Sequence, residues 1–173
     1  MQDILSLTSP CPDQTCALIL KTNAQSAANG LVLTPAQAME IAKTHSRSLR
    51  ENRIVEVGCG GVTKLIDAFA ASPYVDRNNY AEVIDEMTEM FYYIKREVDI
   101  EINDDAVIEA MADFFDRASH GSLELFTARD ADILIGYIRE TKGNWAQNPH
   151  YLLKEEDSYD SQPEYTSAHA NDF

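Results

Sequence analysis

Two groups of carboxylates have a spacing that could bind metal ions. In each group the acids recur every three or four residues along a segment with helical periodicity: Glu82, Asp85, Glu86 and Glu89, then Glu109, Asp113 and Asp116. A dimetal centre in a helical bundle also needs Glu-x-x-His pairs that point into the core. No Glu-x-x-His occurs in the sequence, and most of these acids lie off the apolar stripes. We therefore predict no metal site and interpret the acids as a solvated face, with a docking surface for a basic partner as the alternative.

A glycine-rich segment could hold a nucleotide-like cofactor. Residues 54–61 read Ile-Val-Glu-Val-Gly-Cys-Gly-Gly, which resembles the first motif of S-adenosylmethionine methyltransferases with a Rossmann fold. That fold needs further alternating strands and helices, whereas the segments that follow are patterned as helices. We therefore predict a glycine turn and no cofactor. A small enzyme that uses the Gly58–Gly61 loop for S-adenosylmethionine is kept as an alternative.

Cysteine and histidine point to no further chemistry. Cys11, Cys16 and Cys59 have neither the spacing of zinc ligands nor a histidine at a ligand offset. An odd number of cysteines, with no secretion signal, predicts reduced thiols in a cytoplasmic protein. His45 falls on an apolar helical stripe, so we expect it in the core or at its boundary. No catalytic residue is predicted.

The charge of the chain excludes several classes of partner. Of 173 residues, 14 are Lys or Arg and 29 are Asp or Glu, which gives a formal net charge of −15. Direct binding to nucleic-acid phosphates requires the opposite sign, and so does binding to an anionic membrane. No apolar run approaches the roughly 18 residues of a spanning helix. We expect one cytoplasmic domain with neither kind of contact.

The elements that would position these residues are mainly helical. Thr34-Pro35-Ala36-Gln37 is a capping box with proline in the first turn, Asn103 caps a later helix, and glycines end several helices. The pattern predicts a mainly α fold, with five or six helices in a single helical domain. Leu31–Leu33 and Arg53–Val57 have strand-like patterns, so one short two-stranded β element is kept as an addition to the helices. The helices are expected at about residues 12–28, 34–51, 62–72, 80–98, 103–121 and 128–142, with a further turn at 122–125.

Composition divides the chain into three parts. We predict an N-terminal extension at residues 1–11, a helical domain at 12–143 and an acidic, flexible C-terminal tail at 144–173. Residues 154–173 carry one lysine and six acids, so this segment lacks the apolar content to offset the entropy of ordering. Its aromatic residues are regularly spaced, which leaves docking onto a partner or onto the helical domain as an alternative.

The stretch from Gly30 to Leu125 resembles a small bacterial family of unknown function from anaerobic Gram-positive bacteria. The resemblance rests on Gly-Leu-Val-Leu-Thr-Pro-Ala-Gln-Ala, Arg-Ile-Val-Glu-Val-Gly, Thr-Lys-Leu-Ile-Asp-Ala-Phe, Ala-Ser-Pro-Tyr and Gly-Ser-Leu-Glu-Leu-Phe. It implies a bacterial cytoplasmic protein, and it brings no assigned reaction, cofactor or catalytic residue.

These observations favour a non-enzymatic, acidic interaction protein: an adaptor or subunit that binds a protein partner through a helical surface. The contact residues that we predict are Lys64, Ser72, Pro73 and Tyr74, because they lie in the resembling stretch and tyrosine suits an interface. A different class is an acidic nucleic-acid mimic that inhibits a DNA-binding protein, in which rows of carboxylates would stand in for phosphates.

Overall fold

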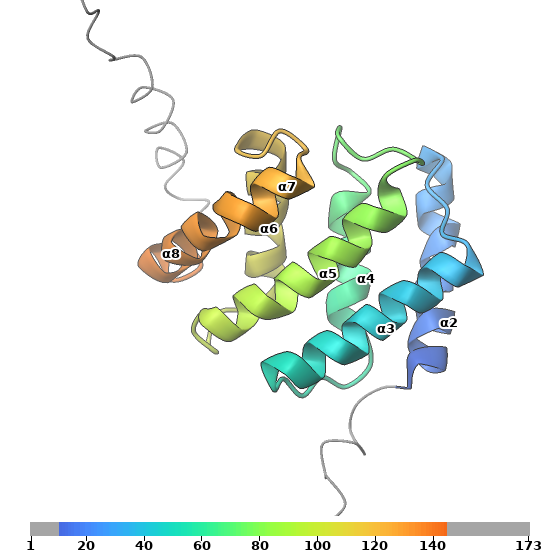
Figure 1. Ribbon diagram of the computed structural model, residues 1–173, viewed down its shortest axis with the longest axis horizontal. Coiled ribbons are helices and arrows are strands. Elements are labelled where there is room, and N and C mark those ends of the chain that lie inside the picture. The colour runs from blue at the N-terminus through green and yellow to red at the C-terminus, as the bar shows by residue number, and fades with distance from the viewer. Residues whose placement is uncertain (1–10, 145–173) are drawn as a thin grey trace, which may run out of the picture.

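The computed structural model describes residues 11–144, and over this range the protein is an all-α domain with six main helices (Figure 1). The main helices are α2 (Pro12–Ser26), α3 (Pro35–Asn52), α4 (Gly60–Phe69), α5 (Tyr80–Glu97), α6 (Asp104–Arg117) and α8 (Ala131–Thr141). Shorter elements are the 3₁₀ turn η1 (Ala27–Asn29), α7 (Leu123–Leu125) and the π-helical turn η2 (Phe126–Asp130). The prediction of a mainly α, single helical domain with five or six helices is therefore confirmed.

Local capping fixes several helix ends where the sequence predicts them. The Thr34 hydroxyl accepts a hydrogen bond from the Gln37 N–H, and the Gln37 side chain accepts one from the Thr34 N–H. Asn103 caps α6 by accepting from the Ala106 N–H at 2.8 Å. Gly30 ends η1 with φ 74°, a left-handed conformation that favours glycine.

The helices pack in layers around one core. Figure 1 shows α3 and α5 crossing in front of α4, with α2 at one side and α6, α7 and α8 at the other. Helix α5 packs against both α4 and α6, so its apolar stripe forms the centre of the domain. The largest fully buried side chains include five phenylalanines and two tyrosines: Phe69, Phe91, Phe114, Phe115, Phe126, Tyr80 and Tyr92.

The β element is not found: within residues 11–144 neither Leu31–Leu33 nor Arg53–Val57 forms a strand. Leu31 and Leu33 are buried in the core, and the side-chain amide of Asn23 bonds both the N–H and the C=O of Leu33, at 2.8 and 2.9 Å. A side chain on α2 thus takes the backbone groups that a neighbouring strand would need. Arg53 adopts φ 56° at the end of α3, which turns the chain out of a strand path.

The remaining boundary predictions fall partly outside the described residues. The first described helix begins at Pro12 and the last one ends at Thr141, both within the predicted helical range of 12–143. The predicted N-terminal extension and acidic tail lie outside the described residues, apart from residues 11 and 144. None of the described helices is both long and apolar enough to cross a bilayer.

Candidate functional site

An open groove lies between α4 and α6. Its volume is about 500 Å³. Four charged side chains line it, Lys64, Asp67, Asp105 and Glu109, together with three apolar ones, Ala68, Ile108 and Ala112. Ala68, Ile108 and Ala112 are less exposed than the four charged side chains, so they form an apolar floor. The groove therefore combines an apolar floor with charged walls, which is the arrangement of a site that holds an amphipathic segment.

Some of the charged side chains that line the groove form an ion pair with each other, and others do not. The Lys64 amine lies 2.9 Å from a carboxylate oxygen of Asp105, across the two helices. This hydrogen bond is the main reason why the pKa of Lys64 is raised. Asp67 and Glu109 form no ion pair with any cation of the described chain. Two carboxylates, one on each wall, are thus free to bind cations of a partner.

The other predicted contact residues lie just beyond the C-terminal end of α4. Ser72 is buried and donates a hydrogen bond of 2.5 Å to Asp116 of α6, so it joins the two helices that form the groove. Pro73 and Tyr74 are exposed. A Cβ atom at Gly121 would overlap Tyr74, so the tyrosine side chain packs directly on the backbone there. Lys64 therefore lines the groove, whereas Ser72, Pro73 and Tyr74 do not.

A second polar cluster lies inside the domain, around the carboxylate of Glu56. This side chain accepts a hydrogen bond of 2.5 Å from the Tyr92 hydroxyl and one of 3.2 Å from the Gly61 N–H. His45 is fully buried, and its Nε2 lies 3.5 Å from Glu56 Oε1, which is close enough for electrostatic attraction but too long for a strong hydrogen bond. The cluster joins α3, the α3–α4 loop, the first turn of α4 and α5.

Opposing effects set the pKa values in this cluster. Burial raises the pKa of Glu56, but His45, Tyr92 and the Gly61 N–H together outweigh burial and hold it below its ordinary value. Burial, followed by the charge of Glu56, raises the pKa of both Tyr92 and the Cys59 thiol. A carboxylate that is held ionised by its donors is a poor general base, so the cluster is built as an anchor for the loop.

The cluster makes the stability of the domain depend on pH at both extremes. Because the folded-state pKa of Glu56 is lowered, its contribution is complete above its ordinary pKa of 4.5 and is lost as the pH falls through the folded value. The raised pKa of Tyr92 has the opposite sign: its contribution is present below its ordinary value of 10.0 and is lost as the pH rises above it.

Urea titrations from pH 3 to pH 11 are expected to show this dependence. The stability difference between the wild type and Glu56→Gln should shrink below about pH 4.5. Above about pH 10 the wild type should lose more stability than Tyr92→Phe. Parallel pH profiles for the wild type and both variants would contradict the proposed coupling.

The glycine segment is used for packing. A Cβ atom on Gly61 would lie 2.8 Å from both Phe91 Cε1 and the Tyr92 hydroxyl, so glycine lets α4 approach α5. The acidic residue of the methyltransferase-like motif, Glu56, is bound by the cluster described above. Packing therefore accounts for Gly61, whereas a Cβ atom on Gly60 would meet open space.

The remaining acids form no recognised metal site. Within residues 11–144, no group of three or more His, Cys, Asp or Glu residues could hold a metal ion. Along α5, burial and then the neighbouring acids Glu89, Asp85 and Glu82 raise the pKa of Glu86. These side chains form a mutually repelling acidic row.

The comparisons with known proteins place the chain in a family. Residues 18–144 match the model of a family of unknown function, DUF6323. The chain belongs to this family. The DUF6323 region includes α3 to α8, and therefore both the groove and the Glu56 cluster. Neither the curated proteins nor the solved structures gave a match.

The sequence located the groove only in part. The residue patterns predict Lys64 as a contact and place Glu109 in an acidic face, but they point to none of the other lining residues: Asp67, Ala68, Asp105, Ile108 and Ala112. The fold brings these residues together because α4 and α6 pack side by side, although the two helices begin 44 positions apart, at Gly60 and Asp104. The helical spacing of Lys64, Asp67 and Ala68 is the signal that could have shown one wall.

Proposed function

We propose that the protein is a non-enzymatic interaction protein that binds a basic, amphipathic helix of a protein partner in the α4–α6 groove. The observation that carries the proposal is the pair of unmatched carboxylates, Asp67 and Glu109, on opposite walls above an apolar floor. Lysines or arginines on two sides of a helix would bind these carboxylates, while an apolar stripe between them would contact Ala68, Ile108 and Ala112.

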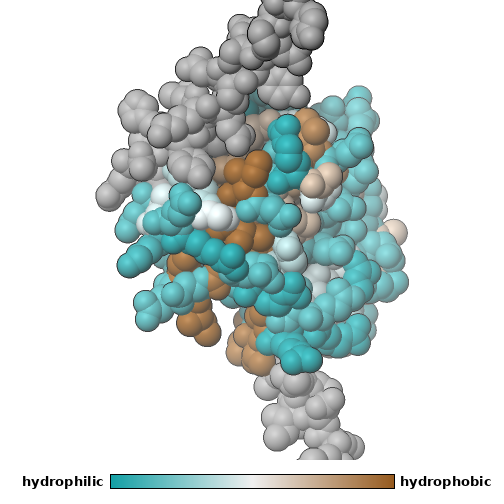
Figure 2. Space-filling model, turned by 60° about the vertical axis from the view of Figure 1, so that its left-hand side comes forward, coloured by the Kyte–Doolittle hydropathy of each residue, from teal (hydrophilic) through white to brown (hydrophobic). Residues whose placement is uncertain are grey.

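Charge also supports a basic occupant. Lys64 is the single basic residue of the groove lining, and Asp105 neutralises it. The chain as a whole carries a net charge of −15, which would attract a cation-rich segment from a distance. On the face shown in Figure 2, hydrophilic side chains dominate and hydrophobic ones appear in small separate groups.

A synthetic helix tests the groove directly. The probe is a fluorescent peptide of 16 to 18 residues with a Leu/Ala stripe flanked by lysines, compared with a scrambled peptide of the same composition. We expect the amphipathic peptide to bind more tightly, and Asp67→Lys with Glu109→Lys to weaken its binding by about tenfold or more. Fluorescence anisotropy at two salt concentrations measures both effects.

A charge-matched control separates the groove from the acidity of the chain. Glu82→Lys with Glu86→Lys changes the net charge equally, but on α5. Equal loss of binding in both double variants, or equal binding of the scrambled peptide, would contradict the proposal. Crosslinking in a lysate from a photoreactive residue at position 112, with position 140 as control, would then identify the natural partner.

A second candidate function, a nucleic-acid mimic, is favoured by the acidic row on α5. Glu82, Glu86 and Glu89 are exposed, and their mutual repulsion contributes to the raised pKa of Glu86. Such a row would present repeated negative charge to a DNA-binding protein. In a pull-down from the same lysate, a partner that is lost with the α5 double variant and kept with the groove variant would support this second function.

The setting of this function is also a proposal. We infer a bacterial, cytoplasmic protein from anaerobic Gram-positive bacteria, from the resemblance described for Gly30–Leu125. All three cysteines are free, which fits a reducing compartment.

A further inference from the structure

The groove between α4 and α6 has two different ends, because the two helices run in the same direction. At one end, Lys64 in the second turn of α4 pairs with Asp105 in the first turn of α6 at 2.9 Å. At the other end, Ser72, just after α4, donates its hydrogen bond to Asp116 in the last turn of α6. The C-terminal ends of both helices therefore lie at the Ser72–Asp116 bond.

The Ser72–Asp116 bond lies in line with the groove. Asp116 follows the lining residue Ala112 by four positions, so both lie on the same face of α6, about 6 Å apart along its axis. Ser72 likewise follows the lining residue Ala68 by four positions, beyond the end of α4. The bond therefore marks the end of the groove about one helical turn past its last lining residue.

The groove is shorter than the helix that we propose as its occupant. The lining residues of α6 run from Asp105 to Ala112, which is about 10 Å along the helix axis. A helix of 16 to 18 residues is about 24 to 27 Å long. When such a helix is centred in the groove, about one turn of it projects at each end. One of its ends therefore lies beside the Ser72–Asp116 bond.

Tyr74 lies next to this bond as an exposed ring that the fold holds in place. Tyr74 is 42% exposed. Its N–H donates a hydrogen bond to Ser72 Oγ at 3.3 Å, and its C=O accepts one from the Asn79 side chain at 2.9 Å. The tyrosine side chain packs on the backbone of Gly121, which has a φ of 77°. A ring held in this way loses little entropy when a partner covers it.

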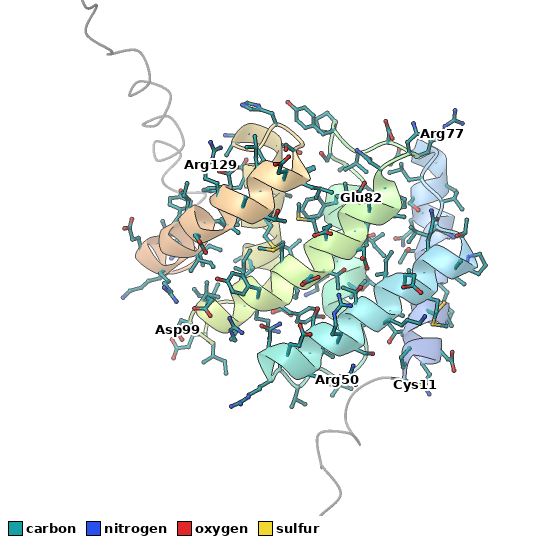
Figure 3. All side chains as sticks on the ribbon, viewed as in Figure 1. Cys11, Arg50, Arg77, Glu82, Asp99 and Arg129 are labelled. Carbon is teal, nitrogen blue, oxygen red and sulfur yellow. The ribbon has the colours of Figure 1, made fainter. Side chains whose placement is uncertain are left out.

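The α4–α5 loop that carries Tyr74 lies at one end of the domain (Figure 3). Arg77 of this loop and Glu82 of α5 mark this end, whereas Arg50 and Asp99 mark the opposite end. A helix that projects from the groove past the C-terminal ends of α4 and α6 therefore meets the Tyr74 loop.

The ring of Tyr74 is suited to a cation of the partner. Within residues 11–144 no cation lies over it, because the cation–π contacts of the described chain involve the rings of Phe91 and Tyr93. The face of an aromatic ring attracts cations, and arginine most often, because its planar guanidinium stacks on the ring. The carboxylate of Asp116 adds negative charge at this end of the groove.

We propose that the partner helix carries an arginine near the end that leaves the groove beside the Ser72–Asp116 bond, and that the guanidinium of this arginine stacks on Tyr74. The inference rests on the proposed function, because the occupant is the same basic helix. It adds a specificity residue outside the groove lining, and it predicts that the partner has an arginine about one to two turns beyond its contacts with Asp67 and Glu109.

Four forms of the fluorescent amphipathic peptide test the contact. They carry arginine or glutamine at the first residue or at the last, so either direction of the helix in the groove is tested. Fluorescence anisotropy gives the gain in affinity that arginine brings over glutamine. At one end of the peptide, we expect this gain to be about two- to fivefold larger for the wild type than for Tyr74→Leu. Tyr74→Phe retains the ring and should keep the larger gain.

The comparison of gains isolates the stacking. The attraction of an added charge to the acidic chain is the same for the wild type and Tyr74→Leu, and the glutamine peptides report any change that the substitution makes in the groove. Equal gains for the wild type and Tyr74→Leu at both ends would overturn the proposal. A gain that Tyr74→Phe also loses would overturn it too, because the hydroxyl and not the ring would then bind the arginine.

The glutamine peptides separate failure of this contact from failure of the proposed function. If Asp67→Lys with Glu109→Lys weakens their binding and the arginine gains are equal, the groove binds the helix and only the Tyr74 contact is wrong. If the double variant binds the glutamine peptides as the wild type does, the proposed function fails, and the Tyr74 contact fails with it.

Discussion

Gly61→Ala is expected to lower the free energy of unfolding by about 1 to 3 kcal/mol, the usual cost of overfilling a packed core. The new methyl group would lie 2.8 Å from both Phe91 Cε1 and the Tyr92 hydroxyl. Both rings are fully buried and cannot turn away without disturbing their neighbours. Urea unfolding followed by circular dichroism gives the change.

Gly60→Ala is the matched control, because it adds the same atom one residue earlier in the same helix. A Cβ atom there meets nothing within 4 Å, and Gly60 has no left-handed φ. We expect this variant to be unchanged or more stable by up to about 1 kcal/mol, through reduced freedom of the unfolded chain. Equal destabilisation by both substitutions would show that the α4–α5 contact does not set the requirement for glycine.

Glu56→Ala is expected to destabilise the domain by about 3 kcal/mol, because it leaves buried donors without an acceptor. The Tyr92 hydroxyl and the Gly61 N–H would both lose their partner. Since these donors lie on α5 and α4, the change should also release the α3–α4 loop. Urea unfolding and amide exchange of the loop measure the two effects.

Two variants show whether the carboxylate itself carries the effect. Glu101→Ala removes an exposed loop glutamate and should change the stability by less than about 0.5 kcal/mol. Glu56→Gln retains an acceptor and should cost less than Glu56→Ala. A loss of stability for Glu101→Ala that equals the loss for Glu56→Ala would contradict the role assigned to the cluster.

The helices were predictable because their signals are local. The capping box at Thr34 and Gln37, the Asn103 cap and the apolar stripe of α5 each lie within a few turns of one segment, and each appears in the structure. The last helix was less accurate: it was expected from residue 128, whereas α8 begins at Ala131 after the π-helical turn η2.

The prediction of a β element was wrong because strand pairing depends on residues that are distant in the sequence. Leu31–Leu33 has strand-like composition, but Asn23 on α2 satisfies the backbone of Leu33. Arg53–Val57 has the alternation of a strand, and the structure retains that alternation in exposure without a neighbouring strand. A pattern of residues gives a segment's local preference, whereas pairing depends on what the fold brings beside it.

The sequence by itself determined the mainly helical class, most helix limits and the acidic character, since these depend on neighbouring residues and on composition. Only the tertiary structure decided that Asp67 of α4 and Glu109 of α6 line one groove, and that His45, Glu56 and Tyr92 meet inside the domain. The reason is physical: periodicity shows which face of a helix is buried, but packing of the whole core selects the helix that covers it.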